Sequence, residues 1–282
     1  MKMAVIGCGL IGGSMALSWK RAGIVDEVIA FGHNPATLQK ALDKGAADTV
    51  TTSMEEAVKD ADIVVSAVPV EAMESVFTEM APFLKSDAVV TDVGSTRQTV
   101  IAAARKGLGD KFHQYAPAHP IAGGEMPGVD YASADLFDEK VVISTPDEGM
   151  DPKVVTFIEE AWRKAGARVQ AMSPLQHDLT FASVSHLPHV LAYALVDMIA
   201  REENAQEKLK MAGAGFRDFT RIASSSPVMW RDICLSNREA LSHELERYRA
   251  SLDTLQKYID ESDGKALESV FENAVRNRRG LV

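Results

Sequence analysis

Cysteine is scarce in this chain. Among 282 residues only Cys8 and Cys234 are cysteines, and they stand far apart in the sequence. Two isolated cysteines give neither a metal-binding spacing nor a disulfide framework, and such scarcity is typical of a reducing compartment. The sequence opens directly on an apolar strand pattern, without a secretory leader. We therefore expect a cytoplasmic protein without a metal site.

Basic residues and long apolar runs are also few. The 30 basic residues against 40 acidic ones give a formal charge of −10, which disfavours nucleic acids and anionic membranes as partners. An anionic substrate would then need a local arginine cluster. The most apolar run, "LPHVLAYALVDMIA", is interrupted by Pro188, His189 and Asp197. This run predicts a buried helix rather than a membrane span.

Strand and helix patterns alternate through the first 170 residues. Short β-branched runs occur at "MAVIG", "EVIAFG", "ADIVVSAVP", "AVVTDVG", "HQYAPAH", "VVIST" and "ARVQAM". Helical patterns lie between most of them, at 11–22, 35–44, 70–81, 96–105 and 151–165. This alternation predicts an α/β fold with a Rossmann-type, doubly wound and mostly parallel sheet.

The pattern becomes almost entirely helical after Met172. We therefore predict a domain boundary near residue 171, with the α/β domain over 1–171 and an all-helical domain over 172–282. Within 236–262, six apolar or aromatic residues recur at heptad-like spacing, from Leu241 to Ile259. This seam indicates either a helix packed on its neighbours in the same chain or a subunit interface.

A glycine fingerprint follows the first strand pattern. "VIGCGLIGGS" places Gly7, Gly9 and Gly12 in G-x-G-x-x-G spacing at the opening of a helix. Gly7 permits a tight turn, Gly9 lets a pyrophosphate approach the backbone, and Gly12 lets the helix pack on the strand. The predicted cofactor-binding residues around this turn and the next strand ends are Gly7, Gly9, Leu10, Ile11, Gly12, Val68 and Pro69.

The loop after the second strand pattern bears on the choice of cofactor. NAD-specific sites carry an acidic residue about 20 positions after the fingerprint, bonded to the ribose 2′-hydroxyl. Gly32 stands at that position, and no carboxylate follows in "GHNPAT". His33, Asn34 and Thr37 offer hydrogen-bond donors where a 2′-phosphate would lie. NADP is therefore the expected cofactor, in preference to NAD.

Two polar residues follow later strand patterns, where open α/β sheets bind their ligands. Ser95 follows "TDVG" and fits either a substrate contact or a helix N-cap for 96–105. His119, in "APAHPIAGGE", fits either a general base for a substrate hydroxyl or a hydrogen-bonded strand-end histidine.

The helical half adds two candidate pairs. His186 and His189 lie three residues apart but lack a further metal ligand at a useful spacing, which argues against zinc. Arg217 and Arg221 lie four apart among apolar residues, and such a pair either recognises carboxylates or pairs with neighbouring acids at the surface. Trp230 follows "SPVM" and on its own fits a core position.

These motifs together resemble the prephenate/arogenate (cyclohexadienyl) dehydrogenase family. The resemblance covers nearly the whole chain. It rests on "GCGLIGGS", "AVPV", "TDVGSTR", "HPIAGGE", "SHLPH" and "FRDFTRIASSSPVMWRDI", in this order. It is a resemblance to the minimal form, without a chorismate mutase or ACT domain. The resemblance implies oxidative decarboxylation of prephenate or arogenate in tyrosine biosynthesis, with hydride transfer to NAD(P)⁺ and tyrosine as an inhibitor. It also implies that residues 1–171 bind the dinucleotide and that residues 172–282 bind the substrate and form a homodimer.

The resemblance also implies roles for individual residues. The histidine of "HPIAG", His119, takes the substrate hydroxyl proton, and Ser95 hydrogen-bonds the same hydroxyl. Substrate-binding positions match His189, Arg221, Arg217, Trp230 and Glu125. Glu125 either pairs with the ammonium group of arogenate or acts as a gate, so the choice between the two substrates stays open.

Four positions depart from the family pattern. They are Gly32, Gly124 where threonine is common, Ala214 within a usual glycine run, and Arg97 where lysine is common. Two other functions remain as alternatives. A β-hydroxyacid dehydrogenase would carry a G-x-x-x-K-x-x-x-N pattern, which is missing from the helical half. A nucleotide-binding redox sensor would not need His119, Ser95 and Arg221 together.

Overall fold

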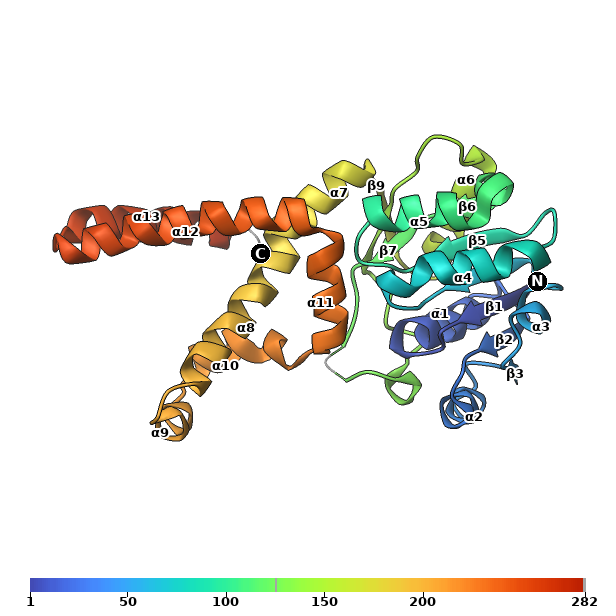
Figure 1. The fold of residues 1–282 in the computed structure, drawn as a ribbon, viewed down its shortest axis with the longest axis horizontal. Coiled ribbons are helices and arrows are strands. Elements are labelled where there is room, and N and C mark those ends of the chain that lie inside the picture. Colours follow the sequence, from blue (N-terminus) through green and yellow to red (C-terminus); the bar gives the residue numbers. More distant parts are fainter. Residues whose placement is uncertain (125, 281–282) are drawn as a thin grey trace. The chain divides into compact units, whose positions relative to one another are not determined.

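A parallel sheet forms the centre of the amino-terminal part of the chain. The computed structural model describes residues 1–124 and 126–280. Its first sheet has the strand order β3-β2-β1-β4-β5-β6, with every neighbouring pair parallel (Figure 1). The strands are β1 (Lys2–Ile6), β2 (Glu27–Phe31), β3 (Thr49–Thr51), β4 (Ile63–Ser66), β5 (Val89–Asp92) and β6 (Tyr115–Ala116). The order in which strands are added to the sheet reverses between β1 and β4. In such sheets the crevice that binds ligands lies at this point, beyond the carboxyl ends of the strands.

Among the described residues, five helices follow strands of this sheet, and a sixth, α6, lies later in the chain and packs against β6. They are α1 (Leu10–Arg21), α2 (Pro35–Asp43), α3 (Met54–Val58), α4 (Met73–Met80), α5 (Gln98–Leu108) and α6 (Pro152–Lys164). The side chains from Met3 to Ile6 are fully buried because the sheet is covered on both faces. Trp19 of α1 meets Trp162 of α6 edge to face, with ring centroids 5.6 Å apart. The Rossmann-type architecture predicted from the sequence is confirmed.

A second, smaller sheet corrects one part of that prediction. The run "HQYAPAH" is not one strand, because Pro117 has no N–H for a ladder and separates β6 from β7 (Ala118–Pro120). β7 pairs antiparallel with β8 (Val141–Ser144), which pairs parallel with β9 (Arg168–Ala171). The short elements β3 and α3 were not predicted, since three and five residues are too few to show a period.

Helices alone follow β9. They are α7 (Pro174–Phe181), α8 (Leu187–Ala200), α9 (Ala205–Lys210), α10 (Ala214–Thr220) and α11 (Pro227–Ser236). A π-helical turn, Ala182–His186, joins α7 to α8 just before Pro188. Such turns reroute backbone hydrogen bonds and are frequent at functional sites. The chain forms two compact units, residues 1–237 and 238–282. The domain boundary predicted near residue 171 coincides with the end of β9 and stays a prediction.

The predicted burial of the apolar run 187–200 is wrong for the single chain. The run does form α8, but only its Ala192 is buried, because the neighbouring helices cover part of its circumference. The continuous helix Pro174–Ala200 is long and apolar enough to cross a membrane, by length and composition only. A core helix of a soluble protein passes the same test, so this finding is weak evidence for a membrane.

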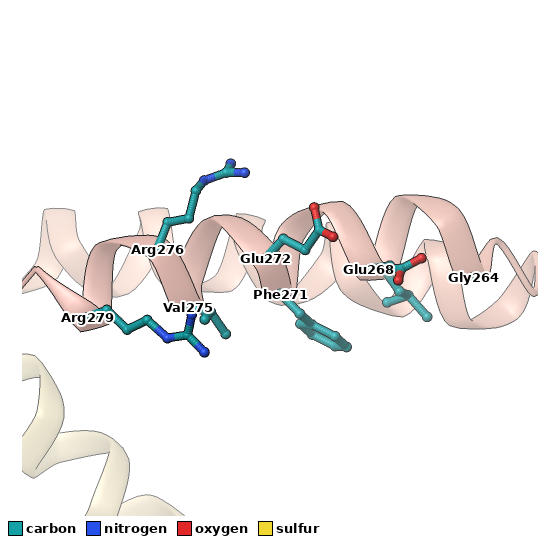
Figure 2. Close-up of a pocket in the computed structure, with 8 residues that line it drawn as sticks. Gly264, Glu268, Phe271, Glu272, Val275, Arg276 and Arg279 are labelled. Atoms are coloured by element: carbon teal, nitrogen blue, oxygen red, sulfur yellow. The ribbon is translucent and has the colours of Figure 1, made fainter.

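The second compact unit is a helical hairpin. It consists of α12 (Arg238–Asp260) and α13 (Gly264–Arg279), which pack against each other. The predicted seam lies on α12, where Leu252 and Ile259 are 47% and 58% exposed. α13 has no buried residue among those described, and Figure 2 shows Phe271 and Val275 on one of its faces, beside charged side chains. Two helices cannot bury these apolar faces by themselves.

Candidate active site

The glycine fingerprint forms a tight turn in front of α1. Gly7 has a φ of +95°, and a Cβ there would lie 2.7 Å from the carbonyl oxygen of Ala67. A Cβ at Gly12 would lie 2.5 Å from the carbonyl oxygen of Gly7. At Gly9, the N-cap of α1, no described atom lies within 4 Å of that position. The backbone there is open to a ligand, and the amino terminus of α1 favours an anion, so the turn fits a dinucleotide pyrophosphate.

One cavity of about 440 Å³ lies beside this turn. Its walls come from the carboxyl ends of β1, β4 and β5, from β7, and from the helical segment. The cavity brings together many of the residues predicted for the site: Gly9, Leu10, Ile11, Gly12, Val68, Pro69, Ser95, His119 and Trp230. Cofactor loop and candidate base therefore face the same space.

The predicted ribose loop does not line this cavity. Gly32 follows β2, and the side-chain oxygen of Asn34 caps α2 by accepting from the backbone N–H groups of Ala36 (2.9 Å) and Thr37 (3.4 Å). His33 is exposed and lies edge-on to Phe31, with ring centroids 5.2 Å apart. Asn34 thus has a structural role that the sequence interpretation did not include.

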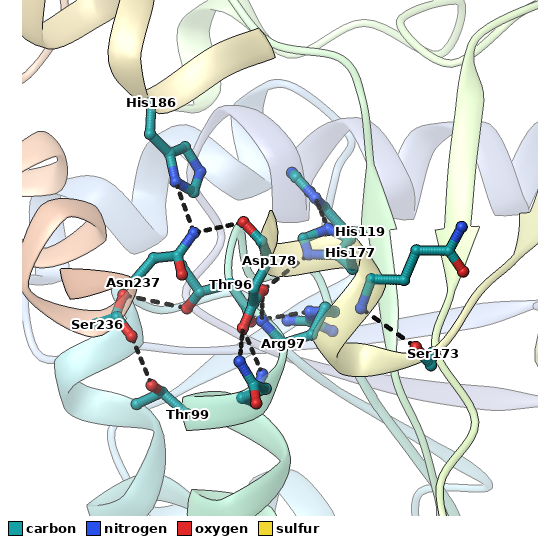
Figure 3. Close-up of polar contacts among 12 residues, drawn as sticks. Thr96, Arg97, Thr99, His119, Ser173, His177, Asp178, His186, Ser236 and Asn237 are labelled. Carbon is teal, nitrogen blue, oxygen red and sulfur yellow. Dashed lines mark hydrogen bonds and ion pairs between the residues drawn. The ribbon is translucent and has the colours of Figure 1, made fainter. Parts of the chain in front are cut away.

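His119 ends a chain of hydrogen bonds that runs into the helical segment (Figure 3). Its Nδ1 lies 2.8 Å from Nε2 of His177, and Nδ1 of His177 lies 2.9 Å from Oδ1 of Asp178. His177 and Asp178 are almost completely buried. Burial, with the nearby His177 and the charge of Arg97, places the pKa of His119 well below its usual value. His119 is therefore neutral at physiological pH.

Asp178 also corrects the interpretation of Ser95. Helix α5 begins at Gln98 rather than at residue 96, and Ser95 does not cap it. Asp178 does so instead, accepting from the backbone N–H groups of Arg97 (2.8 Å) and Gln98 (2.9 Å). The hydroxyl of Ser95 makes no hydrogen bond with any described residue and lines the cavity. It is available to a ligand.

A buried ion pair holds the loop that carries Ser95. Arg97 and Asp92 are both fully buried and form two hydrogen bonds, of 2.6 and 3.1 Å. Asp92 also accepts from the hydroxyl of Tyr115 (2.6 Å) and from the backbone N–H of Gly94 (2.8 Å). The charge of Arg97 is thus balanced by a carboxylate next to Gly94 and Ser95, two residues of the cavity wall.

Two more histidines lie against Trp230. His189 stacks on its ring with centroids 3.6 Å apart, and its Nδ1 contacts the carbonyl oxygen of Ser185 at 2.9 Å. His186 lines the cavity, and its Nδ1 lies 3.1 Å from the side-chain nitrogen of Asn237. Burial lowers the pKa of His186 to about 4. Trp230 is 8% exposed and belongs to both the core and the cavity wall.

The remaining predicted residues lie outside the cavity. Arg217 is on α10, and Arg221 begins the turn after it, and both are exposed. Burial lowers the pKa of His189, and the charge of Arg221 contributes to that shift, so Arg221 lies near the stack of His189 on Trp230. Glu125 lies outside the described residues. In residues 1–124 and 126–280, no group of three or more potential ligands could hold a metal ion.

The sequence interpretation missed His177 and Asp178. They stand in "SPLQHDLTF", 58 residues after His119, and nothing in that spacing indicates contact. The only available signal was an adjacent His-Asp pair in the first turns of a helix that follows the last strand.

Comparisons with known proteins agree with this geometry. Residues 15–171 match the family model of the prephenate dehydrogenase nucleotide-binding domain, and residues 173–273 match that of the prephenate dehydrogenase dimerization domain. The cyclohexadienyl dehydrogenase of Zymomonas mobilis is 36% identical over 99% of this chain and 95% of its own length.

Two solved structures have the same fold over nearly their whole length. Prephenate dehydrogenase from Aquifex aeolicus, in complex with hydroxyphenyl propionate and NAD⁺, is 35% identical with a TM-score of 0.91, covering 99% of this chain and 98% of that one. Synechocystis arogenate dehydrogenase is 27% identical with a TM-score of 0.83, and covers all of both chains. With its fingerprint turn, its cavity histidine and matching models for both parts, this chain belongs to the prephenate dehydrogenase family.

Proposed function

We propose that this protein catalyses the oxidative decarboxylation of prephenate, arogenate or both, with hydride transfer to a nicotinamide cofactor, in tyrosine biosynthesis. One observation carries the proposal: His119 and the open turn at Gly9 face the same cavity. The family membership supports it, since relatives are named for each of the two substrates.

His119 and Ser95 have the positions that this chemistry needs. The nicotinamide, when bound, supplies the hydride acceptor for the carbon that bears the substrate hydroxyl. Nε2 of His119 accepts the hydroxyl proton, and Ser95 donates a hydrogen bond to the same oxygen. The bond to the ring carboxylate then breaks, CO₂ leaves, and the bonding electron pair completes the aromatic ring. His119 returns its proton to the phenolic oxygen, so the step consumes no net proton.

The test measures the formation of reduced nicotinamide through its absorbance. Each substrate is paired with each oxidised cofactor, and kcat/KM is measured for the four combinations. We expect turnover with at least one combination. If none turns over, the nucleotide-binding sensor is favoured over the enzyme.

Arg221 is proposed to hold a substrate carboxylate next to the stacked His189 and Trp230. We expect Arg221→Ala to raise KM roughly 10- to 100-fold, because a charge-assisted hydrogen bond contributes about 1.5–3 kcal/mol. Arg217→Ala is the matched control and should raise KM less. Equal KM values for the wild type and Arg221→Ala would remove Arg221 from the carboxylate site. Tyrosine, which carries both a phenol and a carboxylate, is proposed to compete for the same cavity.

NADP⁺ is proposed as the preferred cofactor. The loop from Gly32 to Thr37 holds no carboxylate that would repel a 2′-phosphate. We expect Gly32→Asp to shift the ratio of kcat/KM values towards NAD⁺, because the new carboxylate accepts from the ribose hydroxyl. A Cβ at Gly32 would lie 3.3 Å from a methyl group of Leu38, so Gly32→Ala is the steric control. A wild type that uses NAD⁺ as well as NADP⁺ between about pH 6 and 9 would contradict the proposal.

A homodimer is proposed for the helical part. Val184 and Met198 are 66% and 58% exposed on the long helix, and Phe271 is 57% exposed on α13. Exposed apolar area of this kind is typical of subunit interfaces, and the matching family model is named as a dimerization domain. Light scattering should give twice the chain mass of 30.5 kDa, and a monomer would contradict the proposal. The cytoplasmic location stays a prediction.

A further inference from the structure

We propose that His177 and Asp178 act as positioning residues that fix the tautomer of His119. In that tautomer the proton of the neutral ring is on Nδ1, and Nε2 is left as a proton acceptor in the cavity. The inference rests on the proposed function, in which His119 is the base. It assigns a task to two buried residues that lie outside the cavity wall.

Asp178 is the fixed end of the chain. Its carboxylate accepts hydrogen bonds from His177, from the backbone N–H groups of Arg97 and Gln98, and from the side-chain amide of Gln98. Burial alone would raise the pKa of Asp178, but the hydrogen bonds from His177 and from these backbone groups outweigh burial and lower it. The amino terminus of α5 also favours a negative charge at this position. Asp178 is therefore an ionised group that only accepts hydrogen bonds.

The direction of every hydrogen bond follows from that charge. Because the carboxylate only accepts, Nδ1 of His177 must donate to it. Burial lowers the pKa of His177 despite the attraction of Asp178, so the ring is neutral and its Nε2 carries a lone pair. Nδ1 of His119, 2.8 Å away, must then donate to that lone pair. Nε2 of His119 is left without a proton.

The packing around His119 prevents the opposite arrangement. His177 is fully buried between His119 and Phe181, with ring centroids 5.0 and 4.4 Å away, so its ring is held in place. The other charged or titratable groups near His119 are Arg97 and His186. Neither has a hydrogen bond to the ring of His119 among the described contacts. When Nε2 accepts a proton, the chain through His177 is the one route of hydrogen bonds among the described residues that leads from the ring to a carboxylate.

The decisive experiment is Asp178→Asn. Oδ1 of Asp178 accepts from both His177 and the backbone N–H of Arg97, and Oδ2 accepts from Gln98. With the amide N–H₂ in the place of Oδ1, the variant donates to His177 and reverses both hydrogen bonds, loses the bond from Arg97, and keeps an oxygen that accepts from Gln98. We expect kcat to fall about 10- to 10³-fold, because an amide behind a catalytic histidine stabilises the wrong tautomer. KM and cofactor affinity should change little. A kcat equal to that of the wild type would overturn the proposal.

The tautomer can also be read directly, without substrate. Nitrogen NMR on isotope-labelled histidine side chains should show Nε2 of His119 unprotonated in the wild type and protonated in Asp178→Asn. A protonated Nε2 in the wild type would overturn the relay. This measurement separates the two proposals, because an inactive protein with the expected tautomer would contradict the proposed function alone.

Three further variants separate positioning from mere stability. The side-chain oxygen of Ser173 caps α7 by accepting from the backbone N–H of Gln176 at 3.1 Å. Ser173→Ala removes this cap, so it should lower the stability of the helix that carries His177 and Asp178 and leave kcat unchanged. His177→Gln keeps an oxygen that can accept from His119, whereas His177→Leu does not. We expect kcat of His177→Gln to exceed that of His177→Leu at least about tenfold. Equal loss in the two variants would assign His177 a packing role only.

Discussion

His119→Asn is expected to lower kcat about 10²- to 10⁴-fold, the usual contribution of a positioned general base. The variant leaves the substrate hydroxyl facing an amide that does not accept the proton at neutral pH. Cofactor affinity should be unchanged, because the fingerprint turn and α1 do not depend on this side chain. Steady-state kinetics and cofactor titration measure the two effects separately.

The pH dependence gives a second check on the same residue. The active form of His119 is neutral, and burial, followed by the influence of His177 and Arg97, places its pKa well below 6.5. Activity is therefore constant with respect to this group above pH 6.5 and is lost only as the pH falls towards the lowered pKa. An acid limb of kcat/KM centred above pH 6.5 would assign that limb to another group.

The control for His119→Asn is another histidine. His113 is exposed, its Nδ1 contacts the carbonyl oxygen of Asp110 at 2.8 Å, and it does not line the cavity. His113→Asn should leave kcat unchanged. A near-normal kcat in His119→Asn would place the base elsewhere in the cavity, and His186 would be the next residue to test.

Local sequence patterns predicted most of the parallel sheet. Strands of four or five buried residues, followed by helices with a 3.6-residue period, carry enough signal over a short window. The end of the first sheet was not predictable in this way. Pro117 sits inside one continuous strand pattern, and only the fold shows that β6 and β7 belong to different sheets.

The site could be predicted where one strand end carries one chemical group. Gly9, Ser95 and His119 each follow a strand, so the topology alone places them at the same edge of the sheet. His177 and Asp178 lie on a helix of another part of the chain, and no local pattern links them to His119. The place of Arg221 relative to the cavity was not predictable for the same reason. It depends on how the helices pack, and other elements of the single chain cover these helices only in part.

The largest effect on stability is expected from Arg97→Met. Arg97 and Asp92 are both fully buried. Among the described residues, removing the guanidinium leaves the carboxylate with the hydroxyl of Tyr115 and the N–H of Gly94 as its hydrogen-bond donors. Breaking a buried ion pair by removing one partner costs about 3–5 kcal/mol, mostly through the unpaired charge that remains. Urea unfolding should show this loss. Arg163→Met, which breaks an exposed pair with Glu159, is the control and should cost at most about 1 kcal/mol.

Arg97→Lys separates the charge of this residue from its shape. Lysine keeps the positive charge but cannot donate to both oxygens of Asp92 in the planar geometry of a guanidinium. It is also the residue that the family resemblance gives as common at this position. We therefore expect Arg97→Lys to cost less than Arg97→Met, about 1.5–3 kcal/mol for the lost charge-assisted hydrogen bond. The charge of Arg97 also helps to keep the pKa of His119 low. The acid limb of kcat/KM should therefore move to higher pH in Arg97→Met, provided that the protein stays folded at the assay temperature, and should stay nearly in place in Arg97→Lys. If the two variants were equally destabilised and their acid limbs coincided with that of the wild type, Arg97 would be a packing residue with no electrostatic influence on the cavity.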